Sequence, residues 1–212
     1  ISNGNSAIAL LQIADKSMAE QSKILDTIKS KLIQANTDTT SQGGRTAIAK
    51  DVTKLLDQLN NIANQTNYNG TALLQKAVGT AASSKAAQAG LSFQIGESTA
   101  DLIKTKSIKA NVSGYGLASL KAKASNGAAL AADATATATN AFARTAASAG
   151  QKAVDKAIST LNGYRGDIGS TQNQVESAVR NLMTQSTNIK AAESIIRDVD
   201  YAEESANFNK LN

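Results

Sequence analysis

Apolar residues in the first third of the chain recur at intervals of three and four, which places them on one face of an α-helix. The first run lies between Ser6 and Ala35 and has one polar member, Gln21. Its apolar members are Leu11, Ala14, Met18, Leu25, Ile28, Leu32 and Ala35. A second run consists of Ile48, Val52, Leu55, Leu59 and Ile62. The polar, glycine-ended segment 36–44 (NTDTTSQGG) separates the runs, so we predict two antiparallel helices joined by a turn.

The last third of the chain carries a longer and more regular pattern. Its apolar positions fall at seven-residue intervals, at Val154, Leu161, Ile168, Val175, Leu182, Ile189 and Ile196. Consecutive heptads in phase predict one long helix whose core seam is formed by these residues. A continuous helix from Val154 to Asn207 would be about 80 Å long at roughly 1.5 Å per residue. Gly163, Gly166 and Gly169 are unfavourable in a helix interior, and their spacing along one face favours close approach of another helix.

The middle of the chain is divided by turn signals and by a change in composition. Residues 64–70 (NQTNYNG) end in Asn-Gly, a pair that favours left-handed turn geometry, so the second helix is expected to stop there. Residues 91–95 (LSFQI) and 107–112 (SIKANV) alternate between apolar and polar and predict two short strands. Residues 113–150 are rich in small side chains and fit a loose helix, a small surface subdomain or a partly disordered insertion.

These patterns predict a mainly α fold of long packed helices with a small β-hairpin region. We expect residues 1–112 to hold the helical hairpin and the β-hairpin. Residues 113–149 are then a variable, surface-exposed insertion, and residues 150–212 form the long C-terminal helix. The chain begins without a Met or a signal-peptide pattern, which indicates an internal fragment of a longer protein.

The amino-acid inventory excludes several classes of protein. The 212 residues include no Cys, His, Pro or Trp. Without thiolates or imidazoles the chain has no disulfide framework, no zinc-thiolate site and no histidine base. We therefore expect no enzyme activity, no cofactor and no metal site. No apolar run approaches the roughly 20 residues of a membrane span, so membrane insertion is not expected.

Two groups of charged residues offer candidate binding chemistry in a chain of net charge +5. The basic group is Lys104, Lys106, Lys109, Lys121 and Lys123, and the acidic group is Glu193, Asp198, Asp200, Glu203 and Glu204. Only Tyr115 lies near the lysines as a stacking group, so nucleic-acid binding is not expected. The alternatives are a solvated surface and binding of an acidic polysaccharide. The acidic residues spread around a helix axis instead of converging, which favours a solvated face or a subunit contact over a cation site.

Several sequence blocks resemble bacterial flagellin, the subunit of the flagellar filament. The N-terminal blocks are residues 10–15 (LLQIAD) and 61–70 (NIANQTNYNG), and the C-terminal blocks are residues 165–170 (RGDIGS), 172–174 (QNQ), 192–194 (AES) and 197–201 (RDVDY). The resemblance covers about residues 1–74 and 150–212, and residues 91–112 more loosely. It implies a packed-helix D1 domain with a variable outward-facing insertion, without the terminal D0 helices of the family. The ending 196–208 (IRDVDYAEESANF) is similar to that of flagellins from Campylobacter-like bacteria.

The resemblance also implies a function, a location and a set of partners. The protein would be a structural subunit of the extracellular filament, assembling for motility with other flagellin subunits and handled by the flagellar export and capping machinery. The turn residues Asn67, Tyr68, Asn69 and Gly70 would then contribute, with the long helix, to filament contacts. The alternative function is that of a flagellin-related cell-surface protein that binds acidic glycans.

Two further sets of residues follow from the resemblance. Members of the family often carry O-glycans on the variable part, and the candidate acceptors here are Ser113, Ser119, Ser125, Thr135, Thr137, Thr139, Thr145 and Ser148. An unmodified polar loop is the alternative.

The host Toll-like receptor for flagellin recognises a stretch that corresponds to residues 27–33 (TIKSKLI). Flagellins that this receptor detects well typically have the sequence Arg-Val-Arg-Glu-Leu-Ala-Val in this stretch. The departures are Thr27, Lys29, Ser30 and Lys31, with Asp51 replacing a Glu on the adjacent helix. Loss of a guanidinium and a carboxylate, and a lysine at an apolar contact, predict weak recognition. The alternative is that these substitutions only follow helix packing.

Overall fold

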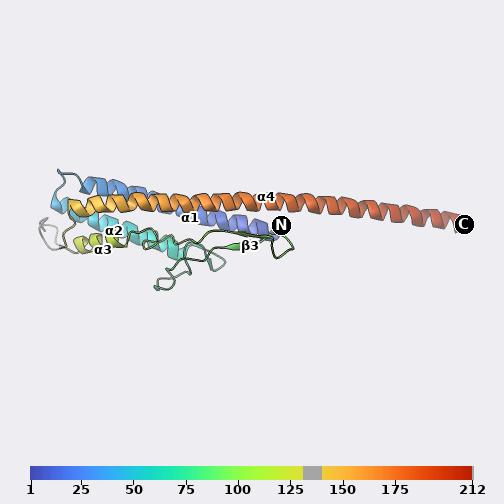
Figure 1. Ribbon diagram of the computed structural model, residues 1–212, viewed down its shortest axis with the longest axis horizontal. Helices are drawn as coiled ribbons and strands as arrows, with labels where there is room; N and C mark the ends of the chain where they lie inside the picture. The colour runs from blue at the N-terminus through green and yellow to red at the C-terminus, as the bar shows by residue number, and fades with distance from the viewer. Residues whose placement is uncertain (131–139, 212) are drawn as a thin grey trace.

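The computed structural model of the chain describes residues 1–130 and 140–211, except for the side chains of Ser194 and of residues 196–211. Within this part, the helices are α1 (Ser2–Ala35), α2 (Gln42–Gln65), α3 (Ala118–Ala128) and α4 (Arg144–Leu211). Figure 1 shows an elongated molecule in which α1, α2 and α3 lie along one half of α4, while the other half extends away from them. The predicted mainly α fold of long packed helices is confirmed.

α1 and α2 form the antiparallel hairpin that the apolar spacing predicts. Ser41 caps the start of α2, because its Oγ accepts a hydrogen bond from Gly44 N at 3.0 Å. The buried Arg45 donates from Nε to Ala35 O at 2.8 Å and from Nη2 to Thr37 O at 3.1 Å. These carbonyls lie at and just beyond the end of α1, where no further helical turn supplies donors. One arginine therefore stabilises the end of α1 from the start of α2.

The seam of α4 is buried only as far as α1 runs beside it. Members of the heptad series from the first half of the helix are fully buried: Val154, Leu161, Ile168 and Val175. Leu182 is only partly buried, and Ile189 is 67% exposed. The prediction that Ile189 belongs to the core of this chain is therefore wrong. Gly4 of α1 lies against Val179 of α4, and no helix lies beside Ile189 in the described part of the chain. The side chain of Ile196 lies outside the described residues.

The three glycines of α4 do not mark a close approach within this chain. α4 continues through Gly163, Gly166 and Gly169 without a break, but apart from the neighbouring backbone of α4 itself no atom lies within 4 Å of where a Cβ would stand on any of them. The prediction that another helix of this chain approaches α4 closely at these glycines is therefore wrong. Close approach occurs instead at Gly150, where a Cβ would lie 2.8 Å from Leu120 Cδ1.

The Asn-Gly turn after α2 forms as predicted. Strand β1 (Asn67–Tyr68) pairs antiparallel with β2 (Thr71–Ala72) across a two-residue turn. Asn69 and Gly70 have φ values of 51° and 84°, the left-handed geometry that a tight hairpin requires at both positions. The chain therefore reverses directly after α2.

The second hairpin differs from the prediction in its second strand. β3 (Ser92–Gln94) lies within the predicted strand 91–95, but it pairs with β4 (Leu102–Lys104). Residues 107–112 make only an isolated bridge, between Ile108 and Gln88.

Two side chains of the helical hairpin hold residues 107–112 in place of a neighbouring strand. Val112 N donates to Asn60 Oδ1 at 2.9 Å, and Gln21 Nε2 donates to Ala110 O at 2.7 Å. Ile108, Ala110 and Val112 are buried, so the alternation of apolar residues marks burial of this segment and not strand pairing.

Much of the predicted insertion packs on the helical body. Within the described part of residues 113–149, Leu117, Leu120 and Phe142 are buried, and α3 lies against α2. Phe142 packs over Gly127, and Gln42 Nε2 donates to Phe142 O at 3.0 Å. The expectation of a purely surface-exposed insertion is wrong for these residues, because their apolar side chains join the core. The division at 1–112, 113–149 and 150–212 stays a prediction.

Candidate functional site

A buried polar network ties the segment after β4 to the centre of the helical hairpin. Gln21, the polar member of the first apolar run, donates from Nε2 to Leu59 O at 3.2 Å and to Ala110 O at 2.7 Å. Tyr115 donates its hydroxyl proton to Gln21 Oε1 at 2.7 Å. Burial raises the pKa of the Tyr115 phenol, and the nearby Tyr164 raises it further, so the proton donor is retained. The network positions residues 110–115, of which Asn111, Val112 and Ser113 line a cavity beside α2.

The turn residues stand at the surface near the end of α2. Asn67 Oδ1 accepts from Gly70 N at 3.2 Å, and Asn67 Nδ2 donates to Gln65 O at 2.9 Å. Asn67, Asn69 and Gly70 are exposed, whereas Tyr68 packs partly against the core. The turn is thus held by its own side chain and remains accessible to another molecule.

Ion pairs engage three of the residues predicted for receptor recognition. Lys29 Nζ lies 2.6 Å from Asp155 Oδ1 of α4, and Lys31 Nζ lies 3.1 Å from Asp51 Oδ2 of α2. The structure thus brings together Lys31 and Asp51, which sequence reasoning treated as separate departures. It also adds Asp155, which no sequence signal indicated because it lies on a distant element.

The remaining two receptor-region residues are exposed on α1. Thr27 donates its hydroxyl to Lys23 O at 3.0 Å within the same helix, and Ser30 faces solvent. All of the predicted positions therefore lie in the region where α1 runs beside α2 and α4.

The candidate glycosylation residues differ in accessibility. Ser113, Ser119 and Thr145 are exposed, while Ser125 and Ser148 are half-buried. Ser113 Oγ accepts from Lys109 Nζ at 3.2 Å. The candidates Thr135, Thr137 and Thr139 lie outside the described residues.

The basic group of the sequence does not form one patch. Lys104 lies on β4, which pairs with β3, whereas Lys121 and Lys123 lie on α3 toward the other end of the helical body (Figure 1). Lys121 pairs with Asp57 at 3.3 Å and lines a cavity together with Lys85, which was not in the predicted group.

The acidic group lies at the far end of α4. Among the described residues, no three His, Cys, Asp or Glu side chains are placed to hold a metal ion. The side chains of Asp198, Asp200, Glu203 and Glu204 lie outside that part, so only Glu193 of this group is described. No helix in the described part of the chain has the length and apolar character of a membrane span.

The projecting part of α4, residues 180–211, exposes large apolar side chains. Met183 is 54% exposed, Ile189 67% and Ile195 64%. Leu102 and Ile103 of β4 share a pocket with Leu182 and Gln185, but farther along α4 Figure 1 shows no other described element beside the helix. Scattered exposed apolar residues are ordinary, but a continuing heptad seam is a surface suited to another helix.

Two regions characteristic of one protein family match the two ends of the chain. The bacterial flagellin N-terminal helical region matches residues 1–78, and the bacterial flagellin C-terminal helical region matches residues 151–212. Flagellin from Bacillus subtilis (strain 168) is 33% identical over 220 residues, which cover 99% of this chain and 71% of that protein. Flagellin A from Helicobacter mustelae is 53% identical over 74 residues, 35% of this chain and only 15% of the relative.

Solved structures share the same arrangement of helices. The crystal structure of Bacillus cereus flagellin matches with a TM-score of 0.62 and 25% identity, over 89% of this chain and 93% of that one. The structure of FliC from Burkholderia pseudomallei matches with a TM-score of 0.54 and 16% identity, which supports the fold alone. Together with the similarity to Bacillus subtilis flagellin along nearly the whole chain, these matches show that the chain belongs to the bacterial flagellin family, the structural, non-enzymatic subunits of the extracellular flagellar filament.

Proposed function

We propose that this chain forms the helical body of a filament subunit, and that the projecting part of α4 is covered by other helices when the filament assembles. The observation that carries this proposal is the continuation of the apolar seam beyond Leu182, where Ile189 is 67% exposed. A seam of this kind is stable in water only when a partner helix fills it. The exposed turn at Asn67–Gly70 would supply a second contact between subunits.

Charge placed on the exposed seam tests this proposal. In the full-length protein, Ile189→Asp should leave the thermal unfolding curve of the monomer unchanged, because the side chain is 67% exposed, but should abolish filaments that sediment on centrifugation. Asn188→Asp, an exposed neighbour on the same helix, is the matched control and should assemble normally. Filaments of Ile189→Asp at the yield of the unchanged protein would show that the projecting seam is not an assembly surface.

We propose that export and capping machinery handle the full-length subunit, because a filament outside the cell grows from subunits that must be delivered there. In the same proposal, the exposed hydroxyls of Ser113, Ser119 and Thr145 are the described candidates for O-glycans. Mass spectrometry of intact protein and of its peptides, purified from the native filament, would locate such sugars. Unmodified peptides at all three positions would contradict this assignment.

We further propose that the host Toll-like receptor for flagellin recognises this protein weakly. Lys29 and Lys31 already pair with carboxylates of the same chain, at 2.6 and 3.1 Å. A receptor would therefore have to compete with these pairs and would find neither a guanidinium at Thr27 nor a carboxylate at Ser30. Recognition energy is concentrated in a few such groups, so several losses together reduce the affinity strongly.

A receptor reporter assay on the full-length protein tests this proposal. The triple variant Thr27→Arg, Ser30→Glu and Lys31→Leu should raise the response, whereas Lys16→Arg, an exposed change on the same helix, should not. A response of the unchanged protein as strong as that of a readily detected flagellin would refute weak recognition.

A further inference from the structure

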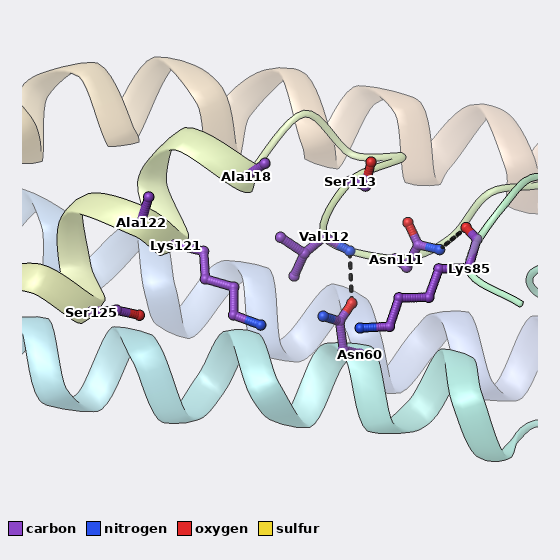
Figure 2. A pocket seen from close by; sticks show the side chains of 9 residues that line it. All are labelled: Asn60, Lys85, Asn111, Val112, Ser113, Ala118, Lys121, Ala122 and Ser125. Atoms are coloured by element: carbon purple, nitrogen blue, oxygen red, sulfur yellow. Dashed lines mark hydrogen bonds between the residues drawn. The ribbon is translucent and has the colours of Figure 1, made fainter. Parts of the chain in front are cut away.

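A cavity of about 370 Å³ lies between α2, α3 and residues 111–113 (Figure 2). Asn60 of α2 lines it, as do Lys121 of α3 and Lys85 from the segment before β3. Figure 2 shows the ammonium groups of Lys85 and Lys121 pointing from opposite sides toward the Asn60 amide. Nitrogen donors from separate segments of the chain therefore face one volume.

Asn60 directs its donor into this volume because its acceptor is already used. Val112 N donates to Asn60 Oδ1 at 2.9 Å, and Figure 2 shows the amide nitrogen of Asn60 on the side of Lys121. Asn111 holds the cavity wall in turn, since its Nδ2 donates to Lys85 O at 2.6 Å and to Gln75 Oε1 at 2.9 Å. These bonds prearrange the donor groups.

The charge in the cavity is unbalanced. Lys121 pairs with Asp57 at 3.3 Å, but Lys85 makes no salt bridge within the described part of the chain. α3 also begins at the cavity wall, at Ala118, with no side-chain cap and no acidic residue in its first turn. The positive end of a helix adds to the lysine charges. An anion between the two ammonium groups would relieve their repulsion.

The rest of the lining suits the body of a sugar. Val112, Ala118 and Ala122 present small apolar surfaces, and Ser113 and Ser125 bring hydroxyl groups. The volume falls at the lower end of the range of small-molecule sites, about 300–1,000 Å³, which fits one sugar ring better than a chain. A sugar ring has C–H groups that can pack against these apolar surfaces. It also has hydroxyl groups that can form hydrogen bonds with Ser113 and Ser125.

We propose that this cavity binds a monosaccharide-sized sugar acid, with its carboxylate between Lys85, Lys121 and the Asn60 amide. The inference goes beyond filament assembly, since it assigns a ligand to a surface between α2 and α3, away from the projecting part of α4. Charge-assisted hydrogen bonds from two lysines hold the carboxylate, and the alanine wall sets the orientation of the ring.

Calorimetric titration of the full chain at about 0.2 M salt tests the proposal, since attraction between exposed charges is strongly screened there. Galacturonate should bind saturably. Galactose has a hydroxymethyl group in place of the carboxylate, so its affinity should be lower by about tenfold or more. Absence of saturable galacturonate binding would overturn the proposal. Sulfate binding as tightly as galacturonate would also overturn it, because the site would then recognise an anion and not a sugar.

Variants of the lining separate this site from general positive charge. Lys85→Gln and Lys121→Gln should each weaken galacturonate binding about tenfold, and Ala122→Leu should weaken it by filling the cavity. Lys123→Gln is the matched control, since Lys123 is exposed on the same helix but does not line the cavity. Equal losses in Lys123→Gln and Lys121→Gln would refute the assignment. Filament formation by all of these variants should be unchanged, so a failure here leaves the assembly proposal standing.

Discussion

Truncation of one apolar side chain at successive heptads should have steeply different effects along α4. Leu161 is fully buried, Leu182 is partly buried and Ile189 is 67% exposed, although all three occupy the same sequence position of the repeat. Leu161→Ala, Leu182→Ala and Ile189→Ala remove similar apolar volumes. The environment of the side chain is therefore the main variable in the series.

The expected loss of stability follows from burial. Leu161→Ala removes buried carbon atoms and leaves a cavity, which typically costs about 2–5 kcal/mol. Ile189→Ala changes a surface position and should stay within about 0.5 kcal/mol. Leu182→Ala should fall between these limits. For a chain of this size, 1 kcal/mol corresponds to roughly 2–4 °C, so Leu161→Ala should lower Tm by about 4–20 °C.

Thermal unfolding of the 212-residue chain, followed by far-ultraviolet circular dichroism, measures the series. Parallel denaturant titrations give the free energies of unfolding directly. Equal Tm losses for Leu161→Ala and Ile189→Ala would refute the reasoning, because they would show that α4 is covered equally along its seam in the isolated chain.

Two further changes test the turn and the buried polar network. Gly70→Val should destabilise the hairpin by about 1–3 kcal/mol because a β-branched residue is strained at φ 84°, while Gly70→Asn should cost less; equal melting temperatures would contradict this. Tyr115→Phe should cost about 1–3 kcal/mol, measured by denaturant titration, because Gln21 Oε1 loses its donor. Burial raises the pKa of Tyr115 above its usual 10, so the unfolded phenol ionises first and the free energy of unfolding should fall as pH rises above about 10. Tyr115→Phe should lack this part of the alkaline loss, and an identical pH dependence in both proteins would contradict the assignment.

Features that depend on neighbouring residues along the chain were predictable from the sequence. The apolar spacing predicts α1, α2 and α4 because the helical period is a property of the local backbone. The turn at Asn69 and Gly70 was predictable for the same reason, since the tolerance of left-handed φ belongs to those residue types. The resemblance to flagellin, carried by blocks at both ends, predicted the family and its structural function.

Contacts between distant segments were not predictable in this way. Residues 107–112 alternate like a strand, yet bonds to Asn60 and Gln21 from other elements decide their structure. The pairing of Lys29 with Asp155 depends on how α1 and α4 are aligned, which no local pattern encodes.

The heptad seam and the cavity beside α3 show most clearly which features follow from local sequence and which depend on contacts between distant segments. The repeat specifies that Leu161 and Ile189 lie on one face of a helix, and this follows from spacing alone. Whether that face is buried depends on what packs against it: Leu161 is fully buried in the helical body, whereas Ile189 is 67% exposed in the described part of the chain. The cavity likewise exists only because α3 folds back onto α2 and brings Lys121 opposite Lys85, residues 36 positions apart in the printed sequence. Periodicity is a short-range property of the backbone, whereas burial and convergence of charge are properties of the packed chain.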